Sequence, residues 1–315
     1  MRGGPEGADV SEFVEWVGVD WGTSNLRAWG LGADGTVVVS RKSDQGMGKL
    51  TREQYPAVLE TLLDGLTGNN GAPLDVLICG MAGARQGWFE APYLEAPTDL
   101  RGLIDGAVRP PMPDNHLSPA ILPGVCQKAG GDNVMRGEET QLLGLATLRP
   151  NAHGVVCMPG THSKWVSMNG TRVEHFSTAM TGELFDLLRH HSVLRHSLAE
   201  NGNGPERAEG FAAGAAVGLE RPEALTSELF AVRAGSLLSG RQPAWCTGYL
   251  SGLLIGTEIG SRRDLIGTQT VPLIGSPALC ALYAQVLGMI GAQGEAVDGT
   301  EVVLAGLKAA RAFIV

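Results

Sequence analysis

The sequence lacks several features that would place a protein in a common functional class. Aromatic residues make up only 5 % of its 315 residues, and no apolar run reaches the roughly eighteen residues that a membrane helix needs. The formal net charge is -9, so a basic surface for nucleic acid is not expected. The polar, acidic N-terminus does not resemble a signal peptide. We therefore expect a soluble cytoplasmic protein.

The cysteine pattern excludes the common metal and redox motifs. Five cysteines occur singly, and no CxxC pair is present, so neither a zinc knuckle nor a thioredoxin-type site is indicated. Cys79, Cys157 and Cys280 lie in apolar runs, which predicts buried thiols in a reducing compartment. Two nucleotide-binding motifs are also missing. The chain contains no GxxxxGK[ST] loop, and no GxGxxG that follows a strand and opens a helix.

The segment VGVDWGTSNLRAW, residues 17–29, predicts two strands joined by a short polar tip. Asp20 ends the first strand and is suited to organising a hydrated Mg²⁺. The tip residues offer backbone N–H groups and hydroxyls to phosphate oxygens, and they are Gly22, Thr23 and Ser24. An ordinary β-turn with an Asx cap explains the same residues equally well.

A second tip of this type follows near the middle of the chain. In GVVCMPGTHSKWVSMNGTRV a strand again leads into glycine and hydroxyl residues, and a strand leaves. Such a repeat predicts two similar domains, whose tips would hold a polyphosphate from opposite sides. The phosphate-binding residues expected here are Gly160, Thr161, Ser163 and Lys164, although the lysine is equally consistent with a solvated charge.

The sequence LIGSP, residues 273–277, predicts a turn from a strand into a helix. Gly275 would allow a flat ligand such as adenine to approach closely, and the helix N-terminus favours anions. A plain helix cap, with Ser276 at the N-cap and Pro277 at the first helical position, is the alternative.

The order of these segments resembles the actin-like ATPase superfamily. The blocks DWGTSNLRAW, GMAGARQGWFEAPYLEAP, NVMRGEETQLLG, MPGTHSKWV, TAMTGELFDLL and LSGLLIGTEI are similar to the 2-dehydro-3-deoxygalactonokinase family, from about residue 17 to about residue 260. The resemblance implies ATP-dependent phosphorylation of the terminal (C6) hydroxyl of 2-dehydro-3-deoxy-D-galactonate, with Mg²⁺. From the residues alone we reach a Mg-ATP phosphotransferase or ATPase.

The fold class implied is α/β, with two actin-like ATPase (ribonuclease H-like) domains of mixed sheets flanked by helices around a central cleft. We expect a disordered lead-in over 1–14, an N-terminal domain over 15–148 and a C-terminal domain over 149–315. The last helix is expected to pack back at the hinge. A homodimer is compatible with this reading, and a non-catalytic or ATPase-only sugar sensor or structural module is the alternative function.

The general base is not marked by a familiar pattern. Related sugar kinases place an aspartate at the start of a helix before the midpoint, where this chain reads GGDNVMRGEETQ. Glu138 is our first candidate and Asp132 the second, with Glu139 also possible. If the segment is helical, Glu138 and Glu139 point about 100° apart, so only one of them readily faces the site.

The implied substrate has a carboxylate, which favours an arginine as its partner. Arg85 follows a buried strand in a glycine-rich loop, and Arg136 lies beside the acids, where an ion pair with them is the alternative. Glu183 would hold a substrate hydroxyl or merely favour the helix dipole. Trp88 is assigned to the pocket wall, with the core as its alternative.

Overall fold

The computed structural model describes residues 12–68, 71–150, 153–199 and 204–313. The chain divides into two compact units. Unit 1 comprises Met1–Ala152, Asn169–Glu174 and Thr300–Val315, and unit 2 comprises His153–Met168 and His175–Gly299. In the part of the chain that the structure describes, no helix is long and apolar enough to cross a membrane.

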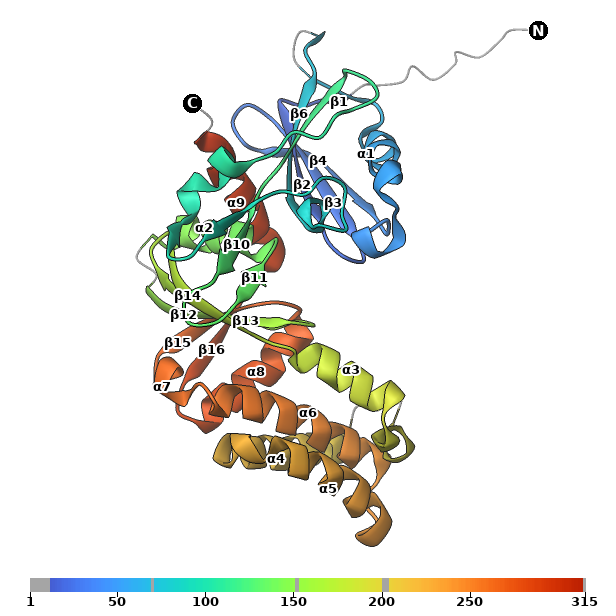
Figure 1. Cartoon of the computed structure of the whole chain (residues 1–315), viewed down its shortest axis with the longest axis vertical. Helices are drawn as coiled ribbons and strands as arrows, with labels where there is room; N and C mark the ends of the chain where they lie inside the picture. Colours follow the sequence, from blue (N-terminus) through green and yellow to red (C-terminus); the bar gives the residue numbers. More distant parts are fainter. Residues whose placement is uncertain (1–11, 69–70, 151–152, 200–203, 314–315) are drawn as a thin grey trace, which may run out of the picture. The chain divides into compact units, whose positions relative to one another are not determined.

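Unit 1 is built on a five-stranded sheet in the order β4-β3-β2-β6-β9 (Figure 1). The strands are β2 (Trp16–Trp21), β3 (Leu26–Leu31), β4 (Val37–Ser43), β6 (Leu74–Gly80) and β9 (Leu117–Ile121). The first three are antiparallel neighbours, as the sequence predicts, whereas β6 and β9 run parallel to β2. Asp20 is paired with Cys79 in this register, so β2 and β6 end side by side. In α/β sheets ligands bind at such carboxyl edges.

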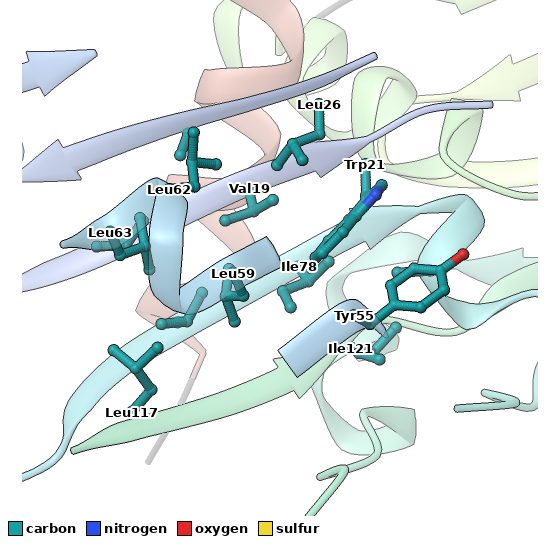
Figure 2. Packing of buried hydrophobic residues seen from close by; sticks show 14 of the residues in the cluster. Val19, Trp21, Leu26, Tyr55, Leu59, Leu62, Leu63, Ile78, Leu117 and Ile121 are labelled. Atoms are coloured by element: carbon teal, nitrogen blue, oxygen red, sulfur yellow. The ribbon is translucent and has the colours of Figure 1, made fainter. Parts of the chain in front are cut away.

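The core of unit 1 lies between this sheet and helix α1 (Tyr55–Leu63). Figure 2 shows Leu59, Leu62 and Leu63 of the helix packed over the strands. Trp88 stacks on Tyr55 with ring centroids 6.0 Å apart, and Tyr55 lies 4.8 Å from Trp21. Trp88 is only 4 % exposed within this aromatic cluster and packs in the core, one of the two roles predicted for it.

A small sheet in the order β11-β10-β7 precedes helix α2 (Glu138–Leu148). Its strands are β7 (Tyr93–Glu95), β10 (Gly124–Gln127) and β11 (Asn133–Met135). The chain is extended through β11, and α2 begins only after Gly137, whose φ of 104° favours glycine. As a result, Asp132 lies in an exposed turn before β11, outside the helix.

Helix α9 (Gly299–Ala312) packs against α2 with its backbone almost in contact. A Cβ added at Gly144 would lie 1.8 Å from the carbonyl oxygen of Val302, and one at Gly306 would lie 1.9 Å from that of Thr140. Only glycine permits this approach. The C-terminal helix therefore belongs to unit 1 from Thr300 onward.

The N-terminal lead-in is shorter than predicted. Residues 1–11 lie outside the described residues, but β1 (Glu12–Phe13) pairs in parallel with β5 (Leu66–Thr67). Val14 is fully buried and donates to the carbonyl oxygen of Thr67. Residues 12–14 are therefore structured, because they pair with β5, a partner more than fifty residues later that the local sequence does not reveal.

Unit 2 repeats the strand order of unit 1. Its sheet runs β16-β15-β12-β13-β14. The first two residues of β14, Arg172 and Val173, belong to unit 1 and pair there with β8 (Thr98–Asp99). The strands are β12 (His153–Met158), β13 (Ser163–Asn169), β14 (Arg172–Ala179), β15 (Thr270–Ile274) and β16 (Gln293–Val297). In both sheets the order is third, second, first, fourth and fifth strand, so the repeat predicted from the two tips is present, and the predicted α/β class is confirmed.

Helices cover the sheet of unit 2. They are α3 (Thr181–His191), α4 (Pro205–Glu220), α5 (Leu225–Leu238), α6 (Pro243–Gly260), α7 (Arg263–Ile266) and α8 (Pro277–Met289). Helices α4 and α6 lie side by side, in contact along most of their length (Figure 1). Their contact uses glycines such as Gly214, where a Cβ would lie 2.1 Å from the carbonyl oxygen of Tyr249. The predicted burial of Cys79, Cys157 and Cys280 is confirmed.

Candidate active site

Asp20 lies at the carboxyl end of β2, with its side chain 20 % exposed. Its Oδ2 accepts a hydrogen bond from Nη2 of Arg27 at 3.0 Å, and Nη1 of the same arginine donates to Thr300 Oγ1 at 2.9 Å. Burial raises the pKa of Asp20, while the Arg27 charge and hydrogen bond oppose the shift. The carboxylate is therefore held at the sheet edge in an environment that favours an additional positive partner.

A second loop, around Gly46 and Gly48, packs against the tip that follows Asp20. Gly22 donates to the carbonyl oxygen of Asn25, which closes the turn, and Gly48 donates to that of Thr23. A Cβ at Gly46 would lie 2.4 Å from the carbonyl oxygen of Thr23, so the two loops are in backbone contact. Thr23 and Ser24 remain exposed.

A pocket of about 670 Å³ opens beside this tip. It is lined by Asp20, by the tip residues Gly22 to Arg27, and by Lys42, Ser43 and Asp44. Arg27 and Lys42 provide the positive charge that bound phosphates need, together with the tip's backbone amides. The sequence analysis had identified Asp20, Gly22, Thr23 and Ser24 but neither cation. An arginine seven residues after the acid was a signal in the same motif.

Glu139 is a second carboxyl group in unit 1 whose pKa is raised by burial. It is fully buried in the first turn of α2, and both its carboxyl oxygens accept from the Gly137 N–H, at 2.8 and 2.9 Å. Burial, reinforced by the neighbouring Glu138, raises its pKa from the ordinary 4.5 to about 8. A pKa near the working pH is what a general acid or base requires.

Two glycines bring the start of α2 close to Asp20. A Cβ at Gly80 would lie 3.5 Å from Asp20 Oδ1, and one at Gly137 would lie 3.2 Å from the Cα of Gly80. The pKa of Cys79 is raised by burial and further by the charges of Asp20 and Glu139, which both lie near its thiol. The two carboxyl groups therefore share one edge of the unit 1 sheet.

Glu138 and Asp132, the two acids preferred as the general base from the sequence, are more accessible than Glu139. Glu138 is half-buried, and its Oε2 accepts from the backbone N–H of Arg136 at 2.9 Å. Asp132 is exposed in the turn before β11. Among the three acids, burial and the contact through Gly80 favour Glu139, which the sequence analysis had ranked last. Its distinguishing feature is burial, which the local sequence does not reveal.

Arg136 is buried and only partly paired. Its Nη2 donates to the carbonyl oxygen of Ala91 at 2.8 Å, and its guanidinium lies 4.3 Å from the ring centroid of Tyr93. Among the described residues, Nε and Nη1 find no hydrogen-bond acceptor. Arg85 is exposed, and its carbonyl oxygen accepts from Arg52. Of the two predicted carboxylate partners, Arg136 is the one with buried, unused donors.

In unit 2 the loop that begins at Gly160 packs against the first turn of α3. A Cβ at Gly182 would lie 2.4 Å from the carbonyl oxygen of Gly160, and the Glu183 N–H donates to that of Thr161 at 3.0 Å. His162 Nε2 is hydrogen bonded to Oε2 of Glu183. Glu183 is therefore tied to the loop, with about a third of its side chain exposed.

Ser163 and Lys164 were predicted to contact phosphate, but in the structure both side chains are buried. Ser163 is fully buried, and its Oγ is hydrogen bonded to Tyr283 Oη at 2.9 Å. Lys164 is 5 % exposed, and its Nζ donates to the carbonyl oxygen of His162 at 3.3 Å. Both residues are at the start of β13, where the strand turns them into the unit. Gly160, Thr161 and His162 are the loop residues that remain accessible at the surface.

The turn after β15 lies beside the same loop. Cys157 pairs with Leu273, so β12 and β15 end together, and a Cβ at Gly275 would lie 2.7 Å from the carbonyl oxygen of Pro159. Ser276 is the N-cap of α8 and accepts from the Leu279 N–H at 3.4 Å, as the plain cap alternative predicts. The structure brings Gly160, Thr161 and Gly275 together within unit 2.

The oxygen ligands available near Asp20 suit a Mg²⁺ ion that is also coordinated by the phosphates of a bound nucleotide. Within the described residues no group of three or more His, Cys, Asp or Glu is arranged to hold a metal by itself. Mg²⁺ usually binds through one or two carboxylates together with substrate phosphates, and it prefers hard oxygen ligands. Asp20, partly exposed next to the pocket, fits that role if the Arg27 side chain moves off Oδ2.

A fold of paired mixed sheets, with an acid and a polar tip at a strand end, defines a phosphate-handling α/β protein. Residues 20–310 match the family described as 2-keto-3-deoxy-galactonokinase. The chain belongs to this family.

The relatives agree with the family match. A Rhizobium meliloti (strain 1021) protein assigned as a 2-dehydro-3-deoxygalactonokinase is 44 % identical over 306 residues, which covers 94 % of this chain and 96 % of the relative. The 2-dehydro-3-deoxygalactonokinase of Escherichia coli (strain K12) is 37 % identical over 299 residues, with 94 % and 97 % covered. A crystal structure from Sinorhizobium meliloti, assigned to the same activity, superposes with a TM-score of 0.85 at 43 % identity, over 95 % of this chain and 96 % of that one.

Proposed function

We propose that this chain is an ATP-dependent kinase that phosphorylates the terminal (C6) hydroxyl of 2-dehydro-3-deoxy-D-galactonate in galactonate breakdown. Family membership supports a phosphotransferase with an alcohol acceptor, and the names of the two curated relatives supply the sugar acid. The observation on which the proposal depends most is the pair of carboxyl groups, Asp20 and Glu139, at one edge of the unit 1 sheet. The reduced thiols and the use of ATP are consistent with a cytoplasmic enzyme.

The nucleotide phosphates are assigned to the pocket beside the first tip. Gly22, Thr23 and Ser24 would supply backbone amides and hydroxyls, and Arg27 and Lys42 positive charge. Mg²⁺, when bound through Asp20, would neutralise charge on the phosphates. On unit 2, Gly160 and Thr161 are the proposed second phosphate-binding residues, and Gly275 is assigned to the adenosine.

Glu139 is proposed as the base that receives the proton of the attacking hydroxyl. The sugar oxygen forms a bond to the γ-phosphorus, ADP leaves with the bridging oxygen, and the hydroxyl proton passes to the carboxylate. Only the ionised form of Glu139 accepts this proton. The raised pKa of about 8 makes the ionised fraction small at neutral pH and makes the carboxylate a stronger base once it is formed.

Arg136 is proposed to bind the carboxylate of the sugar acid. Buried N–H donors without an acceptor destabilise a folded protein, and an anionic ligand that reached Nε and Nη1 would relieve that cost. Arg85 at the exposed loop after β6 is the weaker candidate. Glu183 is assigned to a sugar hydroxyl, with its hydrogen bond to His162 fixing its orientation.

A coupled assay of ADP release tests the proposal. We expect ADP release to require both Mg²⁺ and 2-dehydro-3-deoxygalactonate, with a slower rate for the gluconate epimer and none without a sugar acid. ATP hydrolysis at the same rate with and without any sugar acid would contradict the kinase proposal and favour an ATPase or a sensor. A phosphate found on an oxygen other than that of C6, by ³¹P NMR of the product, would contradict the regiochemistry.

A further inference from the structure

Glu258 of α6 is a buried carboxylate that joins four elements of unit 2, and it is 4 % exposed. Its Oε1 accepts from Trp165 Nε1 of β13 at 2.6 Å, and its Oε2 accepts from Tyr283 Oη of α8 at 2.7 Å. Thr181 Oγ1 at the start of α3 donates to the same Oε2. A buried carboxylate is tolerated only with partners of this kind, so the four elements are held in one arrangement.

The first arm from Glu258 runs to the Gly160 loop through two hydroxyl groups. Tyr283 Oη donates to Glu258 Oε2, and this bond uses the single proton of the tyrosine hydroxyl. Ser163 Oγ, 2.9 Å from Tyr283 Oη, must then donate to that oxygen. Ser163 Oγ is then free to accept a hydrogen bond from the Gly160 N–H, at 3.5 Å. The direction of each bond in the chain is therefore set by Glu258.

The second arm runs through Thr181 to the first turn of α3. The next residue, Gly182, packs directly on the carbonyl oxygen of Gly160, and the Glu183 N–H donates to that of Thr161. A shift of Thr181 would therefore move the turn against which the loop is packed. Both arms end on the same short segment of the chain.

We propose that Glu258 is a positioning residue for the kinase reaction, which fixes the segment 160–164 in the conformation that binds nucleotide phosphates. This inference rests on the proposed function of that loop. Glu258 acts on this loop through Tyr283 and Ser163 and, separately, through Thr181, so its loss lowers the affinity for ATP. Loss of the first arm alone leaves Thr181 bound to Glu258, and it therefore leaves Glu183 and the recognition of the sugar acid unchanged.

The substitution Tyr283→Phe tests the first arm with little change in shape. It removes the hydroxyl between Glu258 and Ser163 and keeps the buried ring. The matched control is Tyr249→Phe, because Tyr249 is also buried in unit 2 and its hydroxyl also donates to a carboxylate, Glu228 Oε2 at 3.3 Å. The measurements are the Kd for Mg-ATP by calorimetry, the KM values for ATP and the sugar acid, and Tm, all on the full chain.

We expect Tyr283→Phe to raise the Kd and KM for ATP by roughly tenfold, the effect of about one lost hydrogen bond, while the KM for the sugar acid stays within about twofold. Tyr249→Phe should lower Tm similarly and change none of these constants. Glu258→Gln should raise the KM for ATP at least as much as Tyr283→Phe.

Two results would overturn the inference. One is an unchanged Kd for ATP in Tyr283→Phe, because the contacts of Glu258 would then be purely structural. The other is an equal rise in both KM values, because the effect would then not be specific to the nucleotide loop. If Glu258→Gln does not fold, Tyr283→Phe decides. If the wild-type chain binds Mg-ATP but releases no ADP with any sugar acid, the proposed function fails, while the comparison of Kd values still tests the role of Glu258.

Discussion

Replacing Glu139 by glutamine should make the protein more stable, and increasingly so as the pH rises. The folded state keeps the Glu139 proton up to a pH of about 8, whereas the unfolded chain releases it near the ordinary 4.5. The folded state therefore binds more protons than the unfolded chain in this interval, and the free energy of unfolding falls as pH rises. Glutamine is neutral at every pH and keeps an oxygen that accepts from Gly137.

The size of this effect follows from the same two pKa values. Each pH unit between them costs the wild-type protein about 1.4 kcal/mol relative to the variant. Between pH 5 and pH 8 the advantage of Glu139→Gln should thus grow by about 4 kcal/mol, an upper figure because a buried site can relax around a charge. Because Glu139 is fully buried, solvent screening reduces the effect little.

Urea unfolding of wild type and variant at pH 5, 6, 7 and 8 measures this difference, with far-UV circular dichroism and tryptophan fluorescence followed together. A difference that stays constant within about 0.5 kcal/mol over this range would refute the raised pKa, and with it the argument for Glu139 as the base.

The same group should control the pH dependence of catalysis. The value of kcat/KM should rise with pH and level off above about 8, as Glu139 ionises. Glu138→Gln removes a neighbouring charge that raises this pKa, so it should move the rise to lower pH while activity is retained. If Glu138→Gln abolishes turnover and Glu139→Gln does not, Glu138 is the base.

Three further predictions follow from the geometry. Asp20→Asn should lower kcat by about 10²-fold or more, because it removes the proposed metal ligand, and near-normal turnover with an unchanged circular dichroism spectrum would contradict that role. Arg136→Gln should raise the KM for the sugar acid by about 10²-fold but should not raise the KM for its uncharged carboxamide. Arg85→Gln should change both KM values little. Equal effects of Arg136→Gln on acid and amide would show that Arg136 does not bind the carboxylate. Gly144→Ala should destabilise unit 1 by about 3 kcal/mol or more in urea unfolding, since the added methyl meets the α9 backbone. The control is Gly288→Ala on α8, which should be neutral or slightly stabilising because nothing lies within 4 Å of the added methyl. Similar stabilities of the two variants would contradict the close helix contact.

The strands and tips could be predicted because their signals are local. Val17 and Val19 alternate along β2, and a short polar turn joins it to the apolar residues of β3, so both strands can be predicted without reference to distant residues. The second tip repeats the pattern, which predicted the duplicated sheet. Asp20 was recognisable since it lies near the end of a buried strand, two residues before Gly22 and the polar tip.

The choice of Glu139 as the proposed general base, and the burial of Ser163 in the second loop, could not be predicted from local signals. The neighbouring acids Glu138 and Glu139 have the same local signals, and only the packing around α2 buries one of them completely. Ser163 has the local pattern of a tip hydroxyl, and only the folded chain brings it into a buried hydrogen bond with Tyr283, 120 residues later.

By itself, the sequence determined the class of fold, the two polar tips and the family, because each depends on residues that are adjacent along the chain. The tertiary structure decided which acid is buried, which arginine keeps unused donors and which hydroxyls face inward. These properties depend on desolvation and on partners far away in sequence, and both exist only once the chain has packed.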